Sequence, residues 1–177
     1  GEVLSYMDLP RNPDVVLLDT EIIVQAPVRL LVSGMGDALS TYFEAKSCQQ
    51  KCAPNSTCGA GHDHPGTLTS YVIAETCYKT LLEYGQAALV SAQASAVTPA
   101  FEHVVEANTL MSGVGFESAG LGCAHAVHNG LSELPECHKY YHGEKVAIGV
   151  LTGLFFNDAS QEIMNHVYDF CEYVSYT

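Results

Sequence analysis

Residues 27–43, PVRLLVSGMGDALSTYF, decide the fold of this chain, because their apolar residues recur at helical spacing. These apolar residues are Leu30, Leu31, Met35, Ala38, Leu39, Tyr42 and Phe43. Pro27 suits the first turn of a helix, whereas Gly34 and Gly36 predict a break or kink just before Asp37. Asp37 is then either the N-cap of a helix that restarts after the glycines or a functional carboxylate in an apolar segment.

The same spacing predicts helices along most of the remaining chain. The expected ranges are about 67–94 with an interruption at Gly85, 98–111, 119–134, 143–156, and a last helix capped by Asp158 or Ser160. A glycine-rich turn is expected over 113–122. The run DVVLLDT at 14–20 is apolar, β-branched and bounded by turn signals, which predicts a buried strand. The sequence therefore predicts a mainly α-helical domain with one strand at its front.

Composition and charge exclude several classes of partner. The chain has 177 residues, which suits one domain, and 47% of them are hydrophobic. Its 20 acidic residues outnumber 7 lysines and arginines, giving a net charge of −13. Such a chain repels phosphate backbones and anionic lipid surfaces, so we expect no nucleic acid and no membrane partner.

Cellular location is predicted from what the sequence lacks. The longest apolar run, 146–156, is shorter than the roughly 20 residues that cross a bilayer. The first ten residues have no basic flank and no apolar core typical of a signal peptide. Seven cysteines, an odd number, are then expected to be mostly reduced thiols in a cytoplasmic protein.

Histidines in two segments, HAVHNG at 125–130 and YYHGEK at 140–145, suggest a metal site. His125 and His128 are three residues apart and share one helix face. His142 opens the next helix, and an antiparallel pair of helices would bring it back beside His125. Two imidazoles and one carboxylate suit Zn²⁺ and leave a coordination position open. Histidines that simply satisfy hydrogen bonds in a core are the alternative.

A second group of metal-compatible residues lies in the loop 48–66. Its members are Cys48, Cys52, Cys58, His62 and His64. Their spacing matches no closed tetrahedral pattern, which favours a surface loop with incidental thiols. The other cysteines fall on predicted helices and are expected at core or boundary positions rather than as nucleophiles: Cys77, Cys123, Cys137 and Cys171.

From about Pro13 to its end the sequence resembles the glycerol dehydrogenases of the iron-containing alcohol dehydrogenase superfamily. The resemblance lies in six motifs: NPDVVLLDTEII (12–23), APVRLLVSGMGDALSTYFEA (26–45), CYKTLLEYG (77–85), VTPAFEHVVEANTLMSGVGFES (97–118), HAVHNGL (125–131) and HKYYHGEKVA (138–147). It implies an α/β NAD-binding domain followed by a helical domain that binds metal and substrate. Residues 1–26 would be the tail of the first domain, otherwise missing here, and 27–177 an incomplete second domain.

The resemblance also implies site residues. Asp37, His125 and His142 match the metal ligands of the family. Iron enzymes of the superfamily usually place a further histidine four residues after the aspartate, where this chain has Thr41, and this favours the zinc-type branch. His128 would be a catalytic residue near the nicotinamide and substrate. Phe116 and Asp37 would contact the substrate.

The function implied is NAD-dependent oxidation of glycerol, or a related vicinal diol, to dihydroxyacetone, with Zn²⁺ polarising the substrate hydroxyl. Assemblies are usual in the family, so a homo-oligomer is expected. Without the nucleotide domain the 177 residues alone are expected to be inactive. The alternative is an inactive metal-binding or structural fragment.

Overall fold

A computed structural model describes residues 11–53, 55 and 65–174. The α-helices are α1 (Thr20–Ile23), α2 (Val28–Lys51), α3 (Leu68–Gln93), α4 (Pro99–Glu106), α5 (Ser112–Ala119), α6 (Cys123–Ser132), α7 (His142–Phe156) and α8 (Gln161–Val174). A π-helical turn, η2 (Ala107–Met111), joins α4 to α5, and a 3-10 turn, η3 (Pro135–Cys137), lies between α6 and α7. Over the described ranges there is no sheet, so the prediction of a mainly helical protein is confirmed.

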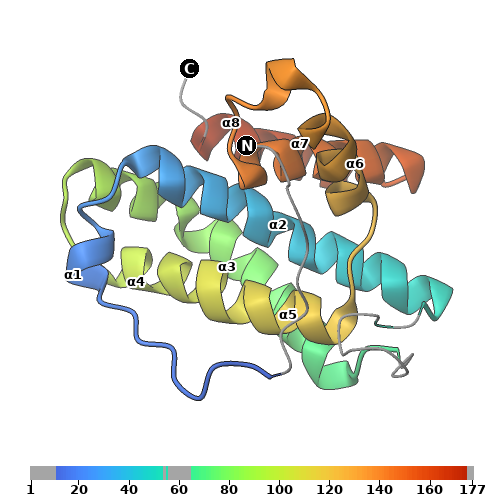
Figure 1. Ribbon diagram of the computed structural model, residues 1–177, viewed down its shortest axis with the longest axis horizontal. Helices are drawn as coiled ribbons and strands as arrows, with labels where there is room; N and C mark the ends of the chain where they lie inside the picture. The colour runs from blue at the N-terminus through green and yellow to red at the C-terminus, as the bar shows by residue number, and fades with distance from the viewer. Residues whose placement is uncertain (1–10, 54, 56–64, 175–177) are drawn as a thin grey trace.

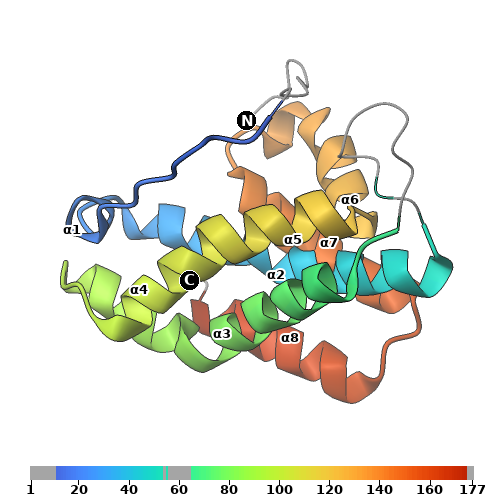
Figure 2. The ribbon, with the colours of Figure 1, turned by 90° about the horizontal axis from the view of Figure 1, so that it is seen from below.

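The long helix α2 occupies the centre of the bundle, as the spacing of its apolar residues predicts. Helices α3, α5 and α7 pack against it, with α6 and α7 on one side and α4 and α5 on the other (Figure 1; Figure 2). The core includes Met35 and Leu39 from α2, Leu81 from α3, and Val146 and Val150 from α7. All five are at most 2% exposed, so α2 is a rigid base for side chains on its other faces.

The predicted break in this helix is wrong. Residues 28–51 form one uninterrupted helix, and Asp37 lies in its middle rather than at an N-cap. The glycines instead allow neighbours to approach closely. A Cβ on Gly36 would lie 2.6 Å from the Gly143 carbonyl oxygen of α7, and one on Gly34 would lie 2.6 Å from the Asn108 side chain.

The run 14–20, predicted as a strand of an otherwise missing domain, is not a strand in the described residues. Residues 15–18 have no regular structure, and the side chains of Val15 and Leu17 are 78% and 89% exposed. Asp19 instead caps the short helix α1 by accepting hydrogen bonds from the backbone of Glu21 and Ile22. A strand needs a hydrogen-bonded neighbour, and the described residues supply none. Whether residues 1–26 belong to a nucleotide-binding domain remains a prediction.

Two helix starts are confirmed where the sequence has a side-chain cap. The Thr67 hydroxyl accepts a hydrogen bond from the Ser70 amide at the start of α3. The Thr98 hydroxyl does the same for Phe101, and Pro99 occupies the first turn of α4. Both starts agree with the predicted ranges, about 67–94 and 98–111.

Two further breaks predicted at glycines are absent: the interruption at Gly85 and the first part of the turn predicted over 113–122. α3 runs through Gly85 without interruption, and this glycine leaves room for Phe170, which would lie 2.9 Å from an added Cβ. The segment 113–119 is helical rather than a turn. The turn is confined to residues 120–122, where Gly120 has a positive φ of 102° that favours glycine.

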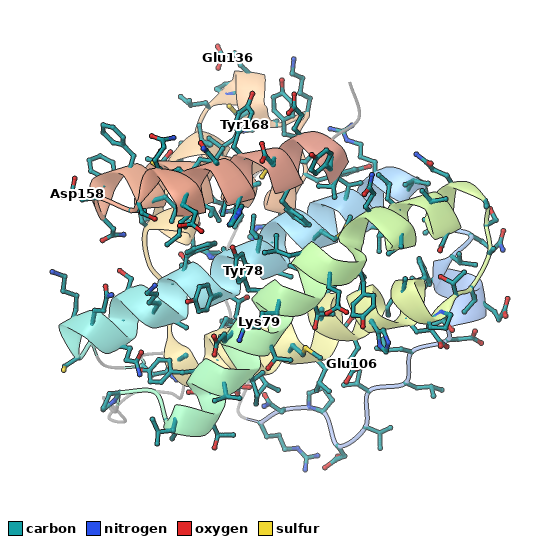
Figure 3. The ribbon with its side chains drawn as sticks, turned by 180° about the vertical axis from the view of Figure 1, so that it is seen from behind. Tyr78, Lys79, Glu106, Glu136, Asp158 and Tyr168 are labelled. Atoms are coloured by element: carbon teal, nitrogen blue, oxygen red, sulfur yellow. The ribbon has the colours of Figure 1, made fainter. Side chains whose placement is uncertain are left out.

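The last helix, α8, packs against α3 and α7, and it faces the viewer in Figure 3. The Ser160 hydroxyl accepts from the Ile163 amide at its start, which settles the choice between the two predicted caps. Val167, Phe170 and Val174 form its buried stripe, whereas Tyr168, labelled in Figure 3, is 57% exposed. Among the described residues, no helix has both the length and the apolar character that crossing a membrane requires.

The cysteines on helices are core or boundary residues, as expected, and this predicts a labelling pattern. Burial raises the pKa of the Cys77 thiol to about 12 and that of Cys171 to about 11, whereas Cys52 is exposed at the end of α2. At about pH 8 a thiol reagent should modify Cys52 in the folded protein and Cys77 only after denaturation, because the thiolate is the reactive form. Peptide mass spectrometry resolves the sites. Equal labelling rates at Cys52 and Cys77 would contradict the packing of α3 against α2.

Candidate metal centre

Three side chains that the sequence proposed as ligands lie together in the structure. One ligand atom each from Asp37, His125 and His142 lies within 4.8 Å of the other two. Asp37 Oδ1 is 3.1 Å from His142 Nε2 and 3.5 Å from His125 Nε2. Among the described residues this is the one such group of histidine, cysteine and acidic side chains. The chain is therefore able to present a carboxylate and two imidazoles to one ion.

Three helices deliver these side chains. Asp37 lies in the middle of α2, His125 is the third residue of α6, and His142 is the first residue of α7. α6 and α7 run antiparallel, because Lys145 contacts Ser132 near the end of α6 while Gly149 of α7 lies against the start of α6. Between these helices, the rings of His142 and His125 lie with their centroids 5.4 Å apart.

Hydrogen bonds to the outer ring nitrogens favour a proton on Nδ1 of both histidines. His125 Nδ1 lies 2.7 Å from Glu44 Oε2, and a carboxylate can only accept, so Nδ1 carries the proton. His142 Nδ1 lies 3.0 Å from His128 Nε2. With a cation bound and both Nδ1 atoms protonated, both Nε2 atoms would keep a lone pair for the ion, whereas without a cation a proton on Nε2 can donate to Asp37. The donor set therefore fits a borderline-soft divalent cation such as Zn²⁺.

The electrostatics of the cluster favour positive charge. Burial alone would raise the pKa of Asp37, but hydrogen bonds to His125 and His142 hold it well below its ordinary value. Burial alone would lower the pKa of His125, but hydrogen bonds to Asp37 and Glu44 raise it to about 9. Without a cation, a proton on His125 therefore offsets part of the negative charge of the two carboxylates. A divalent ion would replace that proton.

His128, predicted to be catalytic, is more enclosed than the three candidate ligands. It is 3% exposed, and its Nδ1 contacts the Asn129 side-chain oxygen at 3.0 Å. Burial lowers its pKa, so the neutral ring can accept the proton that His142 offers. Behind it, Lys145 Nζ donates to Ser132 Oγ at 2.7 Å, and Ser132 Oγ donates to the His128 carbonyl oxygen at 2.9 Å. His128 therefore lies behind His142, in a polar network between α6 and α7.

The remaining positions named from the sequence make other contacts. Thr41, four residues after Asp37, is 2% exposed and shares a 3.0 Å hydrogen bond with Ser112 of α5. Its hydroxyl thus joins two helices. Phe116 lies on α5 and is 38% exposed. No hydrogen bond or ring contact links it to the candidate ligands among the described residues.

The cysteine-rich loop is only partly described. Cys58, His62 and His64 lie outside the described residues. Cys48 is buried near the end of α2 and donates its thiol proton to the Leu121 carbonyl oxygen at 3.3 Å. Cys52 has a left-handed backbone conformation at the end of α2. The two described cysteines therefore serve as a helix–loop contact and a helix end.

Sequence reasoning missed Glu44. Its carboxylate accepts hydrogen bonds from the backbone amide and from the ring Nδ1 of His125. A signal was present. Glu44 follows Asp37 by seven residues, and two helical turns place both carboxylates on one face.

Comparisons with known proteins agree with the motif resemblance. The chain is 59% identical over 174 residues to glycerol dehydrogenase of Thermotoga maritima and 51% identical over 174 residues to that of Citrobacter freundii. Each match covers 98% of this chain and 46% of the relative. A crystal structure of a probable glycerol dehydrogenase from Sinorhizobium meliloti superposes with a TM-score of 0.92 at 40% identity, over 99% of this chain and 48% of that one.

No protein-family model matches the sequence. The chain spans slightly under half the length of the relatives that it matches. The predicted resemblance to glycerol dehydrogenase is confirmed in both sequence and fold over that part.

Proposed function

From this resemblance we propose that the chain forms the metal-binding part of an enzyme that oxidises glycerol to dihydroxyacetone, or acts on a related vicinal diol. The observation that carries the proposal is the convergence of Asp37, His125 and His142 from three helices. Three protein ligands leave a fourth position open, as in catalytic rather than structural zinc sites. The relatives named above, all called glycerol dehydrogenases, support this class of substrate.

NAD is the proposed hydride acceptor, and its binding residues are outside this proposal. When bound, Zn²⁺ would supply a Lewis acid that lowers the pKa of a substrate hydroxyl. Asp37 contributes one negative charge and the two imidazoles none, so the three ligands would leave a net charge of about +1 on the centre. Asp37, His125 and His142 would thus hold the ion without neutralising it, and Asp37 is also proposed to contact the substrate.

Two further residues have roles in the proposal. His128 accepts the proton of His142 Nδ1 across 3.0 Å, and so keeps that ring in the tautomer whose Nε2 faces Asp37. Its position supports the handling of a proton rather than direct contact with the diol, because its side chain is enclosed between α6 and α7. Phe116 is proposed to line the substrate pocket. A cytoplasmic location and a homo-oligomeric assembly complete the proposal.

A metal-binding module without turnover is the alternative class of function. The names of the relatives do not favour it. An assay of NADH formation distinguishes the proposed enzyme from the metal-binding module. In the protein as it occurs naturally, with any sequence that flanks these residues, the enzyme should form NADH with glycerol and 1,2-propanediol.

Chelation is the expected way to abolish this activity. Dialysis against a chelator should reduce NADH formation to background, and added Zn²⁺ should restore it, because the open position of the ion polarises the substrate. A simple alcohol such as 1-propanol serves as the control substrate for the vicinal diols, since it offers only one hydroxyl. Turnover that survives complete removal of the metal would contradict the proposal, and zinc binding without any turnover would favour the alternative.

A further inference from the structure

We propose that Glu44 is a positioning residue of this centre. It holds His125 in the orientation and tautomer that present Nε2 to the cation, and it caps the N-terminus of α6 at the same time. The inference rests on the proposed role of His125 as a metal ligand. It adds a residue that does not touch the ion or the substrate.

The two oxygens of Glu44 have separate partners. Oε1 accepts hydrogen bonds from the backbone amides of Gly122, at 2.8 Å, and His125, at 3.0 Å. Oε2 accepts from His125 Nδ1–H at 2.7 Å. The side chain is 3% exposed, so little water competes for these bonds. One carboxylate therefore fixes both the backbone and the ring of the same histidine.

The start of α6 has no cap of its own. Gly122 occupies the N-cap position and has no side chain to accept a hydrogen bond from the first turn. The first amides of a helix need an acceptor, and their partial positive charge favours an anion. Glu44, from α2, supplies both the acceptor oxygen and the negative charge. Its removal would leave buried amides unpaired and would loosen the turn that carries His125.

α2 sets the distance between the two carboxylates of the site. Asp37 and Glu44 are separated by two turns of a single helix, so both side chains project from one rigid face. Asp37 contacts His125 Nε2 and Glu44 contacts its Nδ1. The imidazole is thus held at both edges, and it is fixed before a cation arrives.

Glu44→Gln separates the capping role from the tautomer role. The amide oxygen of glutamine can still accept from the two backbone amides, but its NH₂ group cannot accept from His125 Nδ1–H. The ring must then give up that hydrogen bond or move its proton to Nε2, where it blocks a ligand lone pair. Loss of such outer partners costs about 10- to 100-fold in metal affinity.

The test compares the zinc affinities of the wild-type chain, Glu44→Gln and Glu75→Gln by competition with a chromophoric chelator. Glu75→Gln is the matched control, because it removes one carboxylate from an exposed pair with Lys79 on α3. Glu44→Gln should weaken zinc binding about 10- to 100-fold at nearly unchanged melting temperature. Glu75→Gln should bind zinc as the wild type does. Glu44→Ala should lose both affinity and stability.

A second readout reports the ring itself. In the zinc-loaded wild type, ¹⁵N-edited NMR should show a slowly exchanging proton on His125 Nδ1, and Glu44→Gln should lose it. Wild-type affinity together with a retained Nδ1 proton in Glu44→Gln would overturn the inference alone. A wild-type chain that binds no zinc would overturn the proposed metal centre, and the inference with it.

Discussion

His142→Ala is expected to abolish tight zinc binding and, with it, any metal-dependent turnover. The variant leaves only Asp37 and His125, so the expected loss of zinc affinity exceeds the roughly 100-fold that outer partners can cost. His142 is 48% exposed at the first residue of α7. The truncation should therefore remove the ligand without opening a cavity in the core.

The loss of zinc binding in His142→Ala should also be visible in thermal stability, because a ligand that binds the folded protein stabilises it. A ligand at 100 times its dissociation constant stabilises the folded protein by about 2.7 kcal/mol. Zinc should therefore raise the melting temperature of the wild-type chain and leave that of His142→Ala almost unchanged. His166→Ala is the matched control, because it removes an exposed imidazole from α8. Full zinc affinity in His142→Ala would end the assignment of this residue as a ligand.

Gly143→Ala is expected to be the most destabilising single methyl addition in the described structure. The added Cβ would lie 1.7 Å from the Ser33 carbonyl oxygen and 2.9 Å from the Asp37 amide nitrogen, both of which are backbone atoms of α2. Overpacking usually costs about 1–3 kcal/mol, and we expect about 3 kcal/mol or more because a helix backbone cannot yield. α7 would be pushed from α2, and His142 would move away from Asp37.

Gly113→Ala is the control for this substitution. Gly113 is also helical, in α5, and an added Cβ would meet nothing within 4 Å. Alanine is a better helix former, so this variant should be neutral or more stable by up to about 1 kcal/mol. Urea unfolding followed by circular dichroism measures both. Equal stability of the two variants would contradict the close crossing of α2 and α7.

The parts of the fold that sequence predicted correctly depend on neighbours within one helical turn. Thr67 and Thr98 cap helices through amides three residues ahead, and Pro99 suits the turn that follows. The pairing of His125 with His142 was predicted as well, because a short connector between two helices leaves few ways to arrange them.

The errors arise where the deciding neighbour is distant in sequence. Gly36 was interpreted as a helix breaker, but its reason for being glycine is the carbonyl of Gly143, more than one hundred residues away. Gly85 makes room for Phe170 in the same way. The run at 14–20 has the composition of a strand, yet pairing needs a second strand, and the described chain contains none.

Glu44 was missed for a related reason. An acidic residue on an amphipathic helix is usually solvated, and nothing local shows that this one is buried against the start of α6. The seven-residue spacing between Asp37 and Glu44 shows that they share a helix face. It does not show that this face contacts α6, which only the packing of α6 reveals. The juxtaposition of Asp37, His125 and His142 was therefore predictable, whereas the group that orients His125 was not.

X-ray absorption at the zinc edge of the loaded chain tests the central claim most directly. The account predicts a first shell of nitrogen and oxygen at about 2.0–2.2 Å, with the outer scattering of two imidazoles from His125 and His142. Sulfur at about 2.3 Å would contradict it, because zinc would then be bound by cysteines such as those of the loop 48–66 and not by the three-helix centre.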